Sequence, residues 1–129
     1  MGKLEFLSEN KELAKNNWKH AINLYEKTGD SMGKANCQRY LGKLEFLKGN
    51  EKDGINFLKI ALIELQETQS LDYEIECLVQ LGECLSKTDE EGKKEAKSYF
   101  ETALEKANQL NVERIINEVK DKMAECLDN

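Results

Sequence analysis

The sequence predicts an all-α fold in which antiparallel helix pairs stack side by side into an extended array. The block Gly-Lys-Leu-Glu-Phe-Leu occurs at residues 2–7 and again at 42–47, and Leu81-Gly82 repeats the Leu41-Gly42 step after another 40 residues. A fixed period of about 20–50 residues is typical of repeat architectures. The 129 residues include no proline, and 34% are charged and 40% hydrophobic. This composition suits one helical domain.

A second pattern runs through the chain with nearly the same period. A small residue is followed by a large apolar one four positions later and by alanine three positions after that, which places all three on one helix face. We expect the large residues to be equivalent wedges, each largely buried between helices. The three copies are Ala14-Trp18-Ala21, Gly54-Leu58-Ala61 and Ala96-Phe100-Ala103.

Turn and capping residues predict seven helices, of which the first is truncated. Their expected ranges are about 2–9, 11–28, 31–48, 51–68, 71–86, 90–110 and 112–127. Every connection is short, so consecutive helices should be antiparallel neighbours. The repeats would cover about 1–29, 30–69 and 70–110, and a capping helix at 111–128 would complete a single domain over residues 1–129.

Helix starts and ends follow from local signals. Gly29 and Gly49 are expected to end helices, and Asp30-Ser31 to begin one. The remaining expected N-terminal caps are Asn10, Ser70, Asn111 and a capping box formed by Thr88 with Glu91.

The small-and-large pattern resembles that of the tetratricopeptide repeat family over nearly the whole chain. The second repeat carries the resemblance through Leu41-Gly42, Gly49, Gly54, Leu58 and Ala61; the first and third match at Gly2, Ala14, Trp18, Ala21, Leu81-Gly82, Leu85, Ala96, Phe100 and Ala103. The resemblance implies a right-handed α-solenoid that acts as a scaffold or adaptor for other proteins.

The chain departs from the usual family pattern in three ways. Glu5, Glu45 and Leu85 stand where the family usually has an aromatic residue, and the proline that often ends a repeat is missing. The period of 40–42 exceeds the common one of about 34. It is more similar to the long repeats of Pins-type spindle adaptors and kinesin light chains.

The expected function is binding an extended peptide or partner helix on the concave face, which the first helix of each pair should form. The face should be basic and aromatic at one end, where an acidic part of the peptide would lie, and acidic at the other. The residues expected there are Asn36, Arg39, Tyr40, Lys43, Glu76, Val79, Gln80, Glu83, Glu118 and Lys122, with Asp121 and Glu125 beside them.

Two other roles compete with this one. Some tetratricopeptide domains grip acidic chaperone tails with a Lys/Asn/Arg clamp, but Tyr40, Glu76 and Gln80 occupy the corresponding positions, which argues against that role. The alternative is a structural spacer or oligomerisation segment of a larger assembly.

The sequence gives little support to catalysis, metal binding or a cofactor. His20 is the only histidine, and there is no phosphate-binding glycine loop or catalytic grouping. The cysteines, Cys37, Cys77, Cys84 and Cys126, recur at repeat spacings and are expected to be buried, reduced thiols rather than a zinc site or redox pair.

Charge and hydropathy restrict the partners and the compartment. A net charge of −6 argues against nucleic acid or an anionic membrane as the main partner. Without a spanning segment or a signal-peptide core, the expected location is the cytoplasm.

The two ends of the array are expected to differ. The helix over 112–127 has a polar outer face, as a terminal cap needs. Leu4, Phe6 and Leu7 are expected on an incompletely covered N-terminal end. Either a longer array or a second molecule, including a symmetric copy in a homodimer, would cover it.

Overall fold

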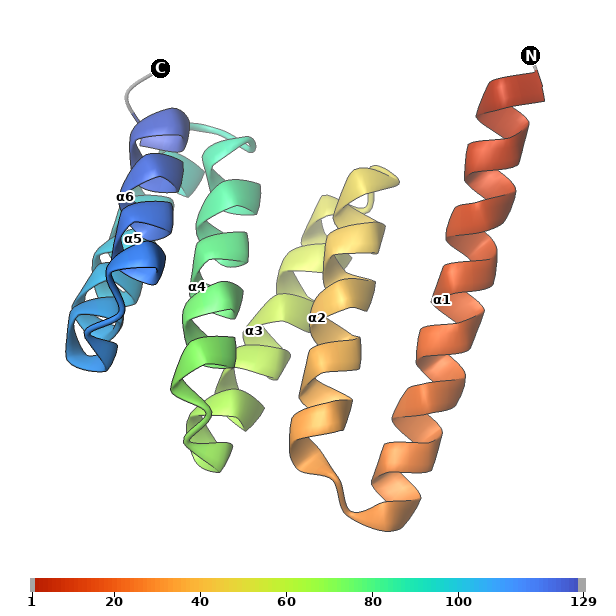
Figure 1. The fold of residues 1–129 in the computed structure, drawn as a ribbon. Helices are drawn as coiled ribbons and strands as arrows, with labels where there is room; N and C mark the ends of the chain where they lie inside the picture. Colours follow the sequence, from red (N-terminus) through yellow and green to blue (C-terminus); the bar gives the residue numbers. More distant parts are fainter. Residues whose placement is uncertain (1, 128–129) are drawn as a thin grey trace.

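The computed structural model describes residues 2–127, with side chains from Glu12 onward, and over this range it contains helices and no strand (Figure 1). The helices form a row that runs from the N-terminal α1 at one end to α5 and α6 at the other. Their bounds are α1 Gly2–Thr28, α2 Ser31–Leu47, α3 Glu51–Thr68, α4 Leu71–Ser86, α5 Glu90–Leu110 and α6 Glu113–Leu127.

The expected break at Asn10 is wrong, because α1 is one continuous helix from Gly2 to Thr28. The described chain therefore has six helices where the sequence predicted seven. No glycine or proline lies between Lys3 and Thr28, so nothing in this stretch forces the backbone out of the helix. The predicted exposure of Leu4, Phe6 and Leu7 falls on side chains outside those that the structure describes.

The other helix boundaries agree with the sequence prediction to within a residue, because they depend on local signals. Gly29 and Gly49 take positive φ angles of 78° and 99° after α1 and α2, a conformation that costs glycine little. Asp30 caps α2 by accepting a hydrogen bond from the Gly33 N–H at 2.9 Å. Gly29 therefore fixes the end of α1, Asp30 the start of α2, and Gly49 the end of α2.

Three of the predicted caps are corrected. Asp89, rather than Thr88, caps α5 by accepting from the Gly92 N–H at 2.7 Å, while the Thr88 hydroxyl donates to the Leu85 carbonyl. Asn111 ends α5 in a left-handed conformation (φ 58°) instead of capping α6. Ser70 occupies the N-cap position of α4 but makes no side-chain capping bond.

The helices form two rows. In Figure 1, α2, α4 and α6 lie in front, and α3 and α5 lie behind them. Each front helix packs along the helix that follows it, α2 with α3 and α4 with α5, and α4 also contacts α2, α3 and α6. Among the described residues, α1 packs only against α2. Helix α4 is therefore the centre of the domain.

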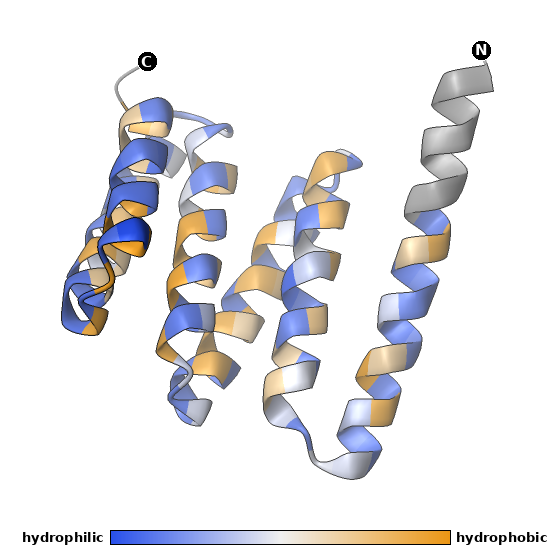
Figure 2. Ribbon diagram, in the orientation of Figure 1, coloured by the Kyte–Doolittle hydropathy of each residue, from blue (hydrophilic) through white to orange (hydrophobic). Residues whose placement is uncertain are grey.

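The core confirms two of the three expected wedges. Leu58 and Phe100 are fully buried (0% exposed), as are the alanines that follow them. Glycines on the facing helices make room for the wedges: a Cβ on Gly82 would lie 2.6 Å from the Phe100 ring. Figure 2 shows apolar segments alternating with polar ones along the helices. The 40-residue series thus marks positions where neighbouring helices approach closely.

Trp18 is not equivalent to the other two wedges, because it is only half-buried. Its ring stacks on Tyr40 of α2, with the centroids 5.4 Å apart and the planes 17° from parallel. The reason is that α1 has a neighbour on one side only, so no second helix covers the indole.

Two buried carboxylates join neighbouring helices. Glu45 of α2 pairs with Lys15 of α1 at 2.8 Å, and Glu74 of α4 pairs with Lys106 of α5 at 2.9 Å. Hydrogen bonds from Lys15 and then Asn50 hold the pKa of Glu45 below its usual value. Removing one partner of such a pair would leave a charge in an apolar setting, so each pair fixes how its helices align.

Candidate functional site

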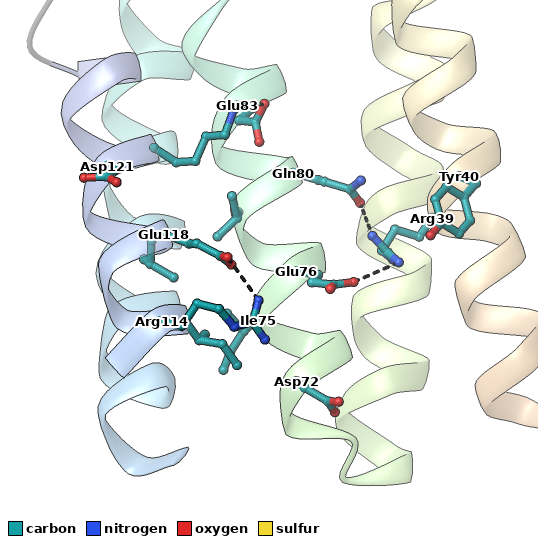
Figure 3. Close-up of a pocket in the computed structure, with 14 residues that line it drawn as sticks. Arg39, Tyr40, Asp72, Ile75, Glu76, Gln80, Glu83, Arg114, Glu118 and Asp121 are labelled. Carbon is teal, nitrogen blue, oxygen red and sulfur yellow. Dashed lines mark hydrogen bonds and ion pairs between the residues drawn. The ribbon is translucent and has the colours of Figure 1, made fainter. Parts of the chain in front are cut away.

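A cleft of about 630 Å³ crosses the front row of helices and is lined by α2, α4 and α6 (Figure 3). We call it the front cleft. Helix α4 provides its middle, so residues one helical turn apart on that helix point toward the same space. The lining residues are Arg39, Tyr40, Asp72, Ile75, Glu76, Val79, Gln80, Glu83, Arg114, Ile115, Glu118, Val119, Asp121 and Lys122.

Arg39 connects α2 to α4 at one end of the front cleft. Its guanidinium donates to the Gln80 Oε1 at 3.0 Å and pairs with the Glu76 Oε2 at 3.1 Å. Two further bonds, at 3.2 and 3.3 Å, reach the Asn36 Oδ1 on its own helix. Only 4% of Arg39 is exposed. A planar guanidinium suits such a site because its donors have a fixed geometry and keep their charge.

Aromatic rings continue this network toward α1. The guanidinium carbon of Arg39 lies 4.6 Å from the centre of the Tyr40 ring, at cation–π distance. The Trp18 ring stacks against Tyr40. Tyr40 remains 43% exposed, so it presents an aromatic surface whose orientation is fixed by both partners.

The floor of the front cleft is apolar and belongs partly to the core. Ile75 and Val119 are 2% exposed, whereas Val79 and Ile115 are half-buried. All four are aliphatic, and they come from α4 and α6. A ligand side chain that covered Val79 and Ile115 would bury apolar surface, which is the main source of affinity in such grooves.

The rim of the front cleft is predominantly acidic. Five carboxylates line it against three basic side chains. Each basic group has an acidic partner: Arg39 has Glu76, Arg114 has Glu118 at 3.1 Å, and Lys122 has Glu83 at 3.8 Å. Among the described residues, Asp72 and Asp121 form no ion pair. The two carboxylates without partners make the rim attractive to a positively charged ligand.

The structure brings most of the predicted binding residues into this one cleft. Arg39, Tyr40, Glu76, Val79, Gln80, Glu83, Glu118 and Lys122 line it, together with Asp121. Asn36 instead lies behind the lining and holds Arg39. Lys43 lines a neighbouring hollow of about 30 Å³, which shares Gln80 and Glu83 with the front cleft.

Sequence reasoning missed Asp72, Ile75, Arg114, Ile115 and Val119 as lining residues. Asp72 and Arg114 lie one turn before Glu76 and Glu118 on the same helix faces, so extending the helical spacing would have found them. The three aliphatic residues carry no such signal, because core and cleft-floor positions have the same pattern.

At the expected basic end of the cleft, the two cations differ in exposure. Arg39 is buried and already paired, and Lys43 lies outside the front cleft. The exposed cation at this end is therefore Lys43, whose hollow shares Gln80 and Glu83 with the front cleft.

The cysteines differ in burial. Cys77 and Cys84 are buried as expected, but Cys37 and Cys126 are only half-buried, and none of the four is in a disulfide. Burial raises the pKa of the Cys77 thiol to about 12 and that of Cys84 to about 11. Within the described part of the chain, no three His, Cys, Asp or Glu side chains come together as a metal site would require.

Comparison with known proteins gives no family assignment. No protein-family model matches the chain, and the search of curated proteins found no match. Separately, none of the helices between residues 2 and 127 is both long and apolar enough to cross a bilayer.

Proposed function

We propose that this chain is a protein–protein interaction module of the tetratricopeptide-like α-solenoid type, and that it binds a peptide or partner helix in the front cleft. The observation that carries the proposal is the cleft itself: an apolar floor between α4 and α6, bordered by Asp72 and Asp121 without ion-pair partners. The two-row packing and the small-and-large repeat support the solenoid assignment. The four unpaired thiols are in keeping with a reducing compartment such as the cytoplasm.

The chemistry of the cleft defines its ligand class. An aliphatic side chain would fill the space over Val79 and Ile115, and lysine or arginine side chains would meet the two aspartates. The exposed ring of Tyr40 would add an aromatic contact at the α2 end. Because Arg39 is held on several sides, the walls are organised before the ligand arrives, which lowers the entropy lost on binding.

Selection of displayed random peptides on the chain tests this proposal. We expect enrichment of sequences that combine lysine or arginine with aliphatic residues. Binding of the selected peptides should fall at least about tenfold in the variant Asp72→Asn/Asp121→Asn, and this effect should shrink in high salt. The matched control is Glu101→Gln/Glu105→Gln, which removes the same charge from exposed positions on α5.

The competing spacer role makes the opposite prediction. If no peptides are enriched, or if the selected peptides bind both variants equally, the front cleft is not a ligand site. Circular dichroism of both variants verifies that a loss of binding does not reflect unfolding.

A further inference from the structure

A second hollow, of about 520 Å³, lies between α5 and α6. We call it the lysine cleft. The residues of α6 that line it are Lys120, Met123, Ala124 and Leu127, whereas the α6 residues that line the front cleft are Arg114, Ile115, Glu118, Val119, Asp121 and Lys122. At 3.6 residues per turn the two sets lie on opposite faces of α6. The lysine cleft is therefore a separate surface.

Its charge is opposite to that of the chain. Lys93, Lys94, Lys97 and Lys120 line the lysine cleft together with apolar residues, and no carboxylate of the described residues lines it. The chain as a whole carries a net charge of −6. Lys94 reaches Glu91 at 3.8 Å, but both side chains are highly exposed, so this pair contributes little. In the described part of the chain, Lys97 and Lys120 form no ion pair.

The spacing of these lysines carries an energetic cost. Lys97 brings a positive charge to the hollow from α5 and forms no ion pair among the described residues, and like charges that face one space repel each other. Lys120 adds a further positive charge from α6 across the hollow. A bound anionic group would relieve this repulsion, so the free energy of the site falls when acidic side chains occupy it.

The floor of the lysine cleft is apolar. Met123 and Leu127 are half-buried and pack against the core cluster that contains Leu85, Ala96 and Phe100. Ala124 is exposed beside them. Methionine adapts its shape to an incoming group, and the lysine stems add apolar walls. The floor can take an aliphatic side chain.

We propose that the lysine cleft is a second docking site, which binds an acidic peptide segment of a partner protein and takes an aliphatic side chain of that segment between α5 and α6. Charge complementarity selects the acidic segment, and the floor over Met123 selects the aliphatic residue. Among the described residues, the lining contains no aromatic ring on which a nucleic-acid base could stack. Met123 and Leu127 are half-buried between α5 and α6, which favours a single inserted side chain over a flat membrane surface. This proposal is independent of the function proposed for the front cleft.

Fluorescence anisotropy with a labelled synthetic peptide tests the proposal on the full chain. The probe carries aspartate and glutamate pairs around two leucines. We expect it to bind at low salt and to lose at least about tenfold in affinity for Lys97→Glu/Lys120→Glu. The control Lys19→Glu/Lys52→Glu makes the same change of net charge at exposed lysines on α1 and α3 and should bind as the unchanged protein does. Replacing the leucines of the probe with serine should also weaken binding.

Several outcomes would overturn the proposal. The first is equal binding by the two double variants, or a probe without leucines that binds as well as the original. A second is that anionic vesicles or an oligonucleotide bind through Lys97 and Lys120 while the peptide does not. A third is that sedimentation shows self-association that depends on these lysines, without peptide binding, which would make the surface a contact between copies. Peptides selected on the front cleft should bind Lys97→Glu/Lys120→Glu normally, so failure of one proposal is distinguishable from failure of the other.

Discussion

The changes Gly82→Ala and Phe100→Leu should have non-additive effects on stability in a double-mutant cycle, because the two residues are in direct contact. A Cβ on Gly82 would lie 2.6–2.8 Å from three ring carbons of Phe100, and these are its nearest neighbours. The change Gly82→Ala therefore forces the ring to move, at a cost of about 1–3 kcal/mol. Alanine has a higher helix propensity than glycine by about 1 kcal/mol. The net effect in the unchanged protein should be a destabilisation of about 1 kcal/mol.

The effect of Gly82→Ala on stability should change from destabilising to stabilising once the Phe100 ring is removed. Phe100→Leu deletes the ring atoms and should by itself cost about 1–2 kcal/mol, because the buried site loses packed volume. In that background Gly82→Ala meets less obstruction, so its propensity gain of about 1 kcal/mol should appear as stabilisation. The coupling between the two changes should therefore be about 2 kcal/mol.

Urea unfolding followed by far-ultraviolet circular dichroism measures all four corners of the cycle. Gly42→Ala combined with Phe100→Leu is the control, because a Cβ on Gly42 would meet Gly54 and Leu58 instead; that pair should be additive. Additivity within about 0.5 kcal/mol for Gly82→Ala and Phe100→Leu would refute the assigned contact.

Three further predictions concern stability and reactivity. Because its ion pair with Lys15 lowers the pKa of Glu45 in the folded state, stability should decline as pH falls from about 5 toward 3, and Glu45→Gln should flatten this part of the unfolding curve; an unchanged slope would contradict the role of the pair. Alkylation followed by mass spectrometry should modify Cys37 before Cys77, whose pKa of about 12 reflects burial; the reverse order would contradict the packing. Gln69→Gly should raise the free energy of unfolding by about 1 kcal/mol, since Gln69 has a φ of 59°; a loss in urea unfolding would show that the glutamine side chain compensates for its backbone.

Local signals in the sequence were sufficient for the helix boundaries after α1. Gly29, Gly49 and Asp30 act within one turn of where they stand, so their effect does not depend on the rest of the fold. The repeat series likewise identified Leu58 and Phe100 as core residues, because a period shared by the chain reflects contacts shared by successive helix pairs. The error at Asn10 came from extending that period into a segment with no glycine or proline to break the helix.

Tertiary structure decided what the local pattern left open. Trp18 has the same sequence context as Leu58, yet it is half-buried because α1 has one neighbouring helix where α3 has two. Arg39 looked from its own helix like an exposed anchor for a ligand; Gln80, 41 residues away, and Glu76 convert it into a buried link between α2 and α4. The sequence thus determined the helices, their order and most of the core, since backbone hydrogen bonds and amphipathic faces are local properties. Which charges stay available to a partner depends on neighbours brought together from distant positions, and only the folded arrangement decides it.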